Sequence, residues 1–185
     1  MTIQTATQGA DLRSLRKARG LTLSDVAERL GKSVGWLSQV ERDISIPEAA
    51  ELSALAEIFG VPVSLFAASV SQKHEHGRIV RTKARRAIGE RTPGLIEQLL
   101  SPDLTDAFEV IHSTFQPGAS RTEPQKRPTA ELAILIDGKL DIWLGTDKFT
   151  ITKGDAFRVR GETLRWANPY DTPAVAVWVI SPPVY

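Results

Sequence analysis

The hydrophobic period of the chain changes once, near residue 87, and this change limits the possible folds more than any other feature. Between residues 11 and 67, apolar side chains recur every three or four positions, which is the period of amphipathic helices. After Ala87, apolar and polar residues alternate in short runs, as in half-buried strands. The sequence therefore predicts a helical domain followed by an all-β domain, with a polar linker between them.

Glycines and prolines divide the helical half into five short helices. Gly20, Gly31 and Gly60 each follow a periodic segment, and glycine commonly ends helices because it tolerates a left-handed backbone. Pro47 and Pro62 can each begin a helix, because the first helical position needs no amide hydrogen. We expect a compact unit of five helices over residues 10–69, preceded by a flexible tail at residues 1–9.

The second half, residues 87–185, reads as a series of short strands separated by turn signals such as Asp137-Gly138 and Gly154-Asp155. This spacing predicts a β-sandwich or barrel. The linker, residues 70–86, contains a possible first strand at Gly77–Thr82. The expected strands after the linker are Leu95–Leu100, Phe108–Phe115, Leu132–Ile136, Leu140–Leu144, Phe149–Thr152, Ala156–Val159, Leu164–Ala167 and Ala174–Ile180.

Composition narrows the class of protein. The chain has no cysteine and no apolar run near the ~20 residues of a membrane-spanning helix, and its first residues lack a signal-peptide pattern. These features predict a cytoplasmic protein without a membrane partner. Residues 1–86 carry 13 Lys and Arg against 9 Asp and Glu, a balance of +4, whereas the remainder has a balance of −3. The basic half is thus the one expected to meet a polyanion.

The stretch "LRSLRKARGLTLSDVAERLGKSVGWLSQVERDISIPEAAELSALAEIFGVPVSLF" resembles the XRE family of lambda-repressor/Cro-like helix-turn-helix domains. Ala27 is small where two helices would cross, and Gly31 suits the tight turn between them. The resemblance implies that the third helix reads the major groove of double-stranded DNA. The residues expected to bind an operator are Arg13, Lys17, Lys32, Ser33, Val34, Gly35, Trp36, Ser38, Gln39 and Arg42.

Individual positions of the third helix suggest different contacts. Gly35 would let the DNA backbone come close, Val34 could meet a thymine methyl, and Gln39 could pair with a purine edge. Trp36 could pack on sugar-phosphate or fold back onto the domain. The resemblance also implies a structural ion pair between Arg16 and Glu41.

The second half resembles a cupin through "PGA", "LIDGKLDIW", "KGDAF" and "NPYDTPAVAVWV". In metal-binding cupins, histidines and a glutamate occupy four positions that correspond here to Glu123, Gln125, Glu131 and Leu164. This set lacks imidazole and makes a poor transition-metal site. We therefore expect no metal, no cofactor and no catalytic residue.

A barrel of this size can still hold one small molecule. Glutamates would suit a cationic ligand such as an amine, whereas Arg121, Arg158 or Arg165 could instead meet an anion, and the sequence leaves both open. Each tryptophan could equally belong to the core. The expected ligand-binding residues are Glu123, Gln125, Glu131, Trp143, Leu164, Trp166 and Trp178.

Together the two resemblances imply an XRE–cupin transcription regulator and not an enzyme. We expect a homodimeric repressor, paired through its cupin domain, that binds an operator and responds to a small-molecule effector. Two alternatives stay open: a cupin enzyme with an appended DNA-binding head, and an antitoxin-like module that binds a protein.

Overall fold

A computed structural model describes residues 7–66, 75, 77–89 and 92–184 of the chain. The chain divides into two compact units. The first comprises Met1–Ile88 together with Ser101–Asp106, and the second comprises Gly89–Leu100 and Ala107–Tyr185. The helical unit therefore extends past the expected linker, residues 70–86, and takes in a short segment from within the β half. No helix among the described residues is long and apolar enough to cross a membrane.

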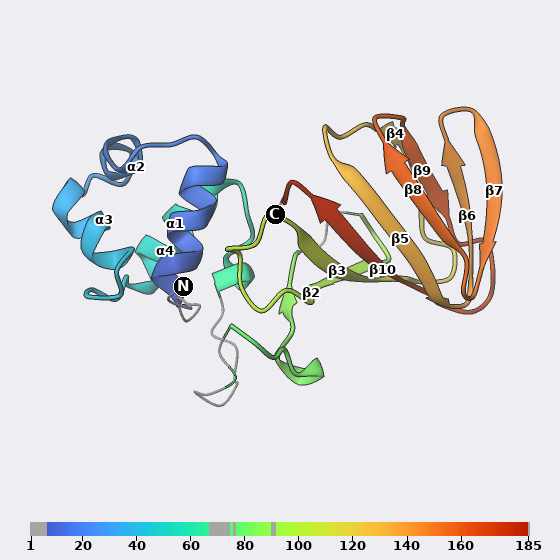
Figure 1. Ribbon diagram of the computed structural model, residues 1–185, viewed down its shortest axis with the longest axis horizontal. Helices are drawn as coiled ribbons and strands as arrows, with labels where there is room; N and C mark the ends of the chain where they lie inside the picture. Colours follow the sequence, from blue (N-terminus) through green and yellow to red (C-terminus); the bar gives the residue numbers. More distant parts are fainter. Residues whose placement is uncertain (1–6, 67–74, 76, 90–91, 185) are drawn as a thin grey trace. The chain divides into compact units, whose positions relative to one another are not determined.

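The first unit is helical (Figure 1). Its described residues form the α-helices α1 (Gln8–Ala18), α2 (Leu23–Leu30), α3 (Val34–Val40) and α4 (Ala49–Phe59). They also form the 3-10 turns η1 (Val63–Phe66) and η3 (Thr82–Ala84) and the two-residue strand β1 (Arg86–Ala87). The prediction of five helices is not confirmed among the described residues: they contain four α-helices, and the four residues after Pro62, Val63–Phe66, form a 3-10 turn.

Local signals set the helix ends. The Thr22 hydroxyl accepts from the Asp25 amide, and the Asp25 carboxylate accepts from the Thr22 amide, so both free amides are satisfied. Gly31 and Gly60 end α2 and α4 with φ of 64° and 66°, a left-handed conformation that costs glycine little. These ends match the positions that the glycines predicted.

Residues 7–9 belong to the helical unit and not to the flexible tail predicted over residues 1–9, of which residues 1–6 lie outside the described residues. Thr7 caps α1, and the Gly9 amide donates to Asp43 Oδ1 at 2.9 Å. A Cβ on Gly9 would overlap the Val40 carbonyl oxygen and lie 2.9 Å from the Glu41 carbonyl carbon. Glycine is needed here because the first turn of α1 packs directly on the backbone that ends α3.

The second unit consists of two antiparallel sheets. One sheet has the strand order β2-β3-β10-β5-β8 and the other the order β4-β9-β6-β7 (Figure 1). The strands are β2 (Leu95–Leu99), β3 (Glu109–Phe115), β4 (Ser120–Gln125), β5 (Ala130–Asp137), β6 (Lys139–Leu144), β7 (Asp147–Thr152), β8 (Ala156–Arg160), β9 (Leu164–Ala167) and β10 (Ala174–Ser181).

Burial alternates along these strands as the period of two predicts. On β3 and β10, every second side chain is buried, and the register aligns these positions: Trp178 opposes Ile111 and Ile180 opposes Glu109. The sequence missed β4, which is mostly polar. The strand expected at Gly77–Thr82 was wrong, since these residues form turns and the start of η3.

Candidate DNA-binding and ligand-binding sites

Helices α2 and α3 form a helix-turn-helix whose inner face is apolar. Val26 and Ala27 of α2 and Leu37 and Val40 of α3 are all at most 1% exposed. Because these four residues take the buried face, the opposite side and the first turn of α3 face solvent. The Ser33 hydroxyl caps that turn by accepting from the Trp36 amide at 3.1 Å.

Gly35 lies exposed in the first turn of α3. A Cβ built at this position would have the Ser33 Oγ, 3.8 Å away, as its nearest described neighbour. Packing within the helical unit therefore does not require glycine at position 35. This leaves room for a close approach from outside the unit.

Several predicted DNA-binding side chains already have partners within the unit. Lys32 forms an ion pair with Glu51 and lies 5.2 Å from the ring centre of the half-buried Trp36. The Ser45 hydroxyl donates to Gln39 Oε1 at 3.1 Å. These contacts hold Lys32 and Gln39 in defined positions at the surface, whereas Arg13 and Lys17 are exposed along α1.

The predicted ion pair of Arg16 and Glu41 is confirmed. Arg16 Nε lies 2.5 Å from Glu41 Oε1, and Nη2 lies 2.9 Å from Oε2. Arg16 Nη1 also donates to the Leu21 carbonyl at 2.9 Å. The hydrogen bond with Glu41 raises the pKa of Arg16 above its ordinary value. The pair joins α1 to the C-terminal end of α3 and so fixes α3 within the helical unit.

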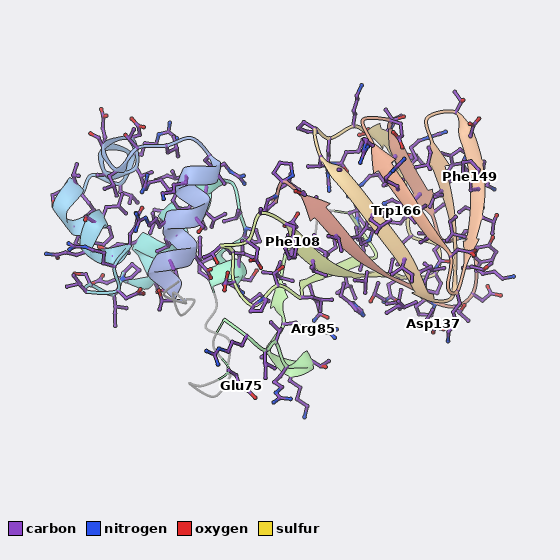
Figure 2. The ribbon with its side chains drawn as sticks, in the orientation of Figure 1. Glu75, Arg85, Phe108, Asp137, Phe149 and Trp166 are labelled. Carbon is purple, nitrogen blue, oxygen red and sulfur yellow. The ribbon has the colours of Figure 1, made fainter. Side chains whose placement is uncertain are left out.

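The barrel contains a cavity between its two sheets. The cavity has a volume of about 40 Å³. Figure 2 shows the side chains of the barrel, with Trp166 of β9 labelled. The lining residues are Leu95, Glu97, Ser113, Phe115, Arg121, Gln125, Arg127, Glu131, Val159, Leu164, Trp166, Trp178 and Ile180.

The structure brings five of the predicted ligand-binding residues to this lining, namely Gln125, Glu131, Leu164, Trp166 and Trp178. Two others lie outside it. Glu123 is exposed on β4, in the interval where the β4–β9 register shifts between Arg121 and Gln125. Trp143 has Lys148 and Arg165 over its ring, at 5.1 and 5.2 Å from the ring centre.

Sequence reasoning missed Glu97, Ser113 and Arg127 as lining residues. A signal existed for Glu97, which interrupts the apolar positions of a strand between Leu95 and Leu99. Ser113 occupies the equivalent place on β3 and pairs with Glu97 in the register. Such polar breaks at inward positions mark a site, because an unpaired polar group in a core is costly.

A polar network covers one side of the cavity. Arg121 donates through Nε and Nη2 to Thr92 Oγ1, at 3.1 and 2.6 Å, and through Nη1 to Gln125. Arg127 donates to Gln125 Oε1 at 3.3 Å and lies 3.7 Å from Glu131. The Thr129 hydroxyl donates to Glu131 Oε1 at 2.8 Å. The network holds both guanidinium groups at the cavity wall.

The residues at the metal-ligand positions of cupins do not fit a transition metal. Within the cavity they supply an amide from Gln125, one carboxylate from Glu131 and the apolar Leu164, while Glu123 lies outside the lining. Among the described residues, no three His, Cys, Asp or Glu side chains are grouped as a metal site. The donor set suits hydrogen bonding to an organic ligand better than metal coordination.

A buried polar cluster in the first unit joins α1 to the segment Ser101–Asp106. Arg86 Nη1 lies 2.6 Å from Asp11 Oδ2, and both side chains are 9% exposed. The Leu104 amide donates to Asp11 Oδ1 at 2.8 Å, and Arg86 Nη2 donates to the Pro102 carbonyl at 3.2 Å. The sequence analysis placed Arg86 at the end of a polar linker, whereas the structure buries its side chain against Asp11.

The outer face of β5 and β10 is apolar. Leu132, Ile134 and Ile136 project from β5, and Val179 from β10; these side chains are 41% to 53% exposed. Leu132 opposes Val179 in the register, so the row is continuous across the two strands. These four side chains thus form a continuous exposed apolar row on this face of the sheet.

Comparisons with known proteins agree with both halves. A model of the helix-turn-helix domain matches residues 9–68, and a model of the cupin domain matches residues 111–180. Among solved structures, KdgF from Halomonas sp. is similar to this chain with a TM-score of 0.50 and 18% identity, covering 58% of this chain and 96% of that one. This likeness supports the cupin fold of the second unit.

Two curated relatives match along most of their length. The HTH-type transcriptional regulator SutR of Escherichia coli (strain K12) is 30% identical over 148 residues, covering 80% of this chain and 78% of that protein. The HTH-type transcriptional regulator PuuR of the same organism is 22% identical over 154 residues, covering 82% and 81%. The chain therefore belongs to the XRE-type helix-turn-helix transcriptional regulators that carry a C-terminal cupin domain.

Proposed function

We propose that this DNA-binding regulator is a repressor whose operator affinity changes when a small molecule binds in the cupin barrel. The observation that carries the proposal is the cavity itself, which combines charged side chains with aromatic walls in the domain joined to the DNA-binding unit. Sites that bind small molecules have this combination of an apolar lining and a few fixed polar groups.

For DNA recognition, α3 would enter the major groove with its exposed first turn leading. Val34, Gly35 and Gln39 would meet base edges or the adjacent backbone, because they lie on the exposed side of this helix. Arg13, Lys17 and Arg42 would bind phosphates. The Arg16–Glu41 pair supports this presentation by fixing the end of α3 against α1.

The apolar face of β5 and β10 would pair two copies of the chain. A second copy is the occupant that the function requires, because helix-turn-helix dimers bind half-sites about one DNA turn apart, ~34 Å. Pairing through Leu132, Ile134 and Val179 would remove the exposed apolar row from water. The cupin domain would thus set the spacing of the two recognition helices.

Ligand binding would reach the helical unit through the connection between β2 and β3. Strand β2 carries Glu97 at the cavity, and its chain continues at once into Ser101–Asp106, which belongs to the helical unit. There the Leu104 amide and Arg86 meet the Asp11 carboxylate of α1. A shift of β2 upon ligand binding would therefore act on the first helix of the DNA-binding unit.

The test begins with selection of DNA sequences by the full-length protein, followed by titration of the selected operator with fluorescence anisotropy. We expect binding at least 1,000-fold tighter than to scrambled DNA, in the range typical of specific regulators, about 10³ to 10⁷. In a purified transcription assay, the protein should reduce transcription from a promoter that overlaps this operator. Equal affinity for operator and scrambled DNA, or activated transcription, would contradict the proposal.

A further inference from the structure

One carboxylate of the cavity has little compensation from the protein itself. Glu97 of β2 lines the cavity, between the buried residues Leu95 and Leu99. From the described residues its side chain accepts one hydrogen bond, from the Ser113 hydroxyl at 3.4 Å, longer than the ~2.5–3.0 Å usual for two oxygens. No lysine or arginine in the described part of the chain forms an ion pair with it. A carboxylate has about four acceptor positions, so most of those of Glu97 are open to the cavity.

The other three charged residues of the lining are held more firmly. Arg127 lies 3.7 Å from Glu131, which also accepts a hydrogen bond of 2.8 Å from a neighbouring threonine. Arg121 donates three hydrogen bonds to neighbouring side chains. Glu97 is therefore the charged lining residue whose printed partner is a single, distant neutral group, and a cation is the ligand group that would compensate it.

Short and aromatic side chains neighbour this carboxylate on the inner face of the sheet. In the strand register Glu97 opposes Ser113, and Ser113 opposes Ala176, so the inward row beside Glu97 has short side chains. Phe115 is the next inward residue of β3 and Trp178 the next inward residue of β10, and both line the cavity. Aromatic rings attract a cation through their faces and also pack on alkyl groups.

We infer that the barrel binds a small primary alkylammonium ion, whose charged group meets Glu97 and whose alkyl chain packs on Phe115 and Trp178. This inference rests on the proposed ligand-sensing function and names its ligand class. An alkylamine is protonated at pH 7, as lysine is, and its three donors suit the oxygens of Glu97 and Ser113. A water-sized group takes up about 10–15 Å³, so a cavity of about 40 Å³ suits a short chain of about two to four carbons.

The test measures binding to the full-length protein by tryptophan fluorescence and isothermal titration calorimetry, at pH 7 and constant ionic strength. The probes are the chloride salts of ethylamine, n-propylamine and n-butylamine, each offered up to ~10 mM. For each amine that binds, we also test the alcohol and the carboxylate of the same chain length, together with tetramethylammonium, a cation without N–H donors. At least one primary amine should bind, and its neutral, anionic and quaternary counterparts should each bind at least 10-fold more weakly.

A matched pair of variants locates the charge. Glu97→Gln keeps the size of the side chain but removes its negative charge. It should weaken amine binding at least 10-fold and remove the preference for the amine over the alcohol. Glu123→Gln makes the same change on an exposed residue of β4 outside the lining and should leave binding unchanged. Amine binding that survives Glu97→Gln undiminished would place the ammonium group elsewhere and overturn the inference.

The outcomes distinguish the ligand class from the sensing function. If no primary amine binds at ~10 mM, or if one counterpart binds as tightly as the amine, the ligand class is wrong whatever happens at the operator. If an amine binds with the expected pattern but leaves operator affinity unchanged, the class stands and the sensing function fails. The series of counterparts on the unmodified protein decides the matter even if a variant does not fold.

Discussion

Arg16 on α1 and Glu41 at the end of α3 form a doubly hydrogen-bonded ion pair inside the helical unit. The two nitrogen–oxygen distances are 2.5 and 2.9 Å, and both side chains are largely buried. Breaking a buried pair of this kind strongly destabilises the fold, because removing one partner leaves the other charge buried without a counter-charge. The orientation of α3, the proposed recognition helix, therefore depends on a contact buried inside the helical unit.

Replacing Glu41 with glutamine should test this dependence. The Arg16 guanidinium would keep its bond to the Leu21 carbonyl but lose its counter-charge, and we expect the free energy of unfolding to fall by about 3 kcal/mol. Chemical denaturation at pH 7 measures it. Glu57→Gln, on an exposed part of α4, is the matched control and should change stability by less than about 0.5 kcal/mol.

Gly35→Ala should separate stability from DNA binding. The added methyl group meets open space in the unit, and alanine favours a helix over glycine by about 1 kcal/mol, so stability should stay equal or rise. Operator affinity should fall at least 10-fold if the DNA backbone approaches this residue. Ser53→Ala, exposed on α4, is the control for both measurements. Unchanged operator affinity in the Gly35 variant would remove this residue from the proposed interface.

The apolar face of β5 and β10 predicts the oligomeric state. The double variant Leu132→Lys and Ile134→Lys would bring two like charges into a dimer interface, and the protein should become monomeric in sedimentation velocity. Operator affinity should also fall when the dimer is lost, because a monomer would bind DNA through a single recognition helix. Phe149→Lys, which changes an exposed apolar residue of β7, should leave the dimer intact. A double variant that stays dimeric would show that another surface pairs the chains.

Replacing Arg86, which pairs with Asp11, should separate ligand binding from its effect on operator affinity. Arg86→Met keeps the length of the side chain but removes its bonds to Asp11 and to the Pro102 carbonyl. We expect ligand affinity to stay within 2-fold, while the effect of ligand on operator affinity is lost. Arg81→Met, which removes a mostly exposed arginine paired with Glu75, is the control and should respond to ligand normally. A normal response in the Arg86 variant would argue against this route.

The stability of the barrel at low pH should depend on Asp141. Burial raises the pKa of Asp141, but hydrogen bonds from Lys148, Thr150 and Tyr170 outweigh it, so that pKa lies below its ordinary value in the folded state. The ionised form therefore stabilises the fold above the unfolded pKa of about 3.9, and this stabilisation is lost as the pH falls through the lower folded pKa.

Asp141→Asn should accordingly be less stable than the natural protein at pH 7 by about 1 kcal/mol, with a difference that shrinks toward pH 2. Urea denaturation at several pH values measures this difference. Asp147→Asn, which removes an exposed carboxylate of the same hairpin, is the matched control. A constant difference for both variants would mean that Asp141 does not contribute to acid sensitivity.

Strand β4 and Gly9 show where the hydrophobic periodicity of the sequence no longer predicts the structure. Its sequence, SRTEPQ, has no apolar alternation, because the side chains that it turns toward the cavity are Arg121 and Gln125. Pairing with β9 makes it a strand, and such pairing is a long-range contact. Gly9 was missed for the same reason: its need to be glycine comes from the Val40 carbonyl, far along the chain.

The sequence by itself determined the two folds and the ends of α2 and α4, because hydrophobic period and turn glycines act over neighbouring residues. It could not decide between a cationic and an anionic ligand. Glu97 and Arg121 lie on strands of different sheets, and only the closure of the barrel brings them to one cavity. Only the tertiary structure decided which charged side chains line the cavity, because residues far apart in the sequence come together there through strand pairing and the packing of the two sheets.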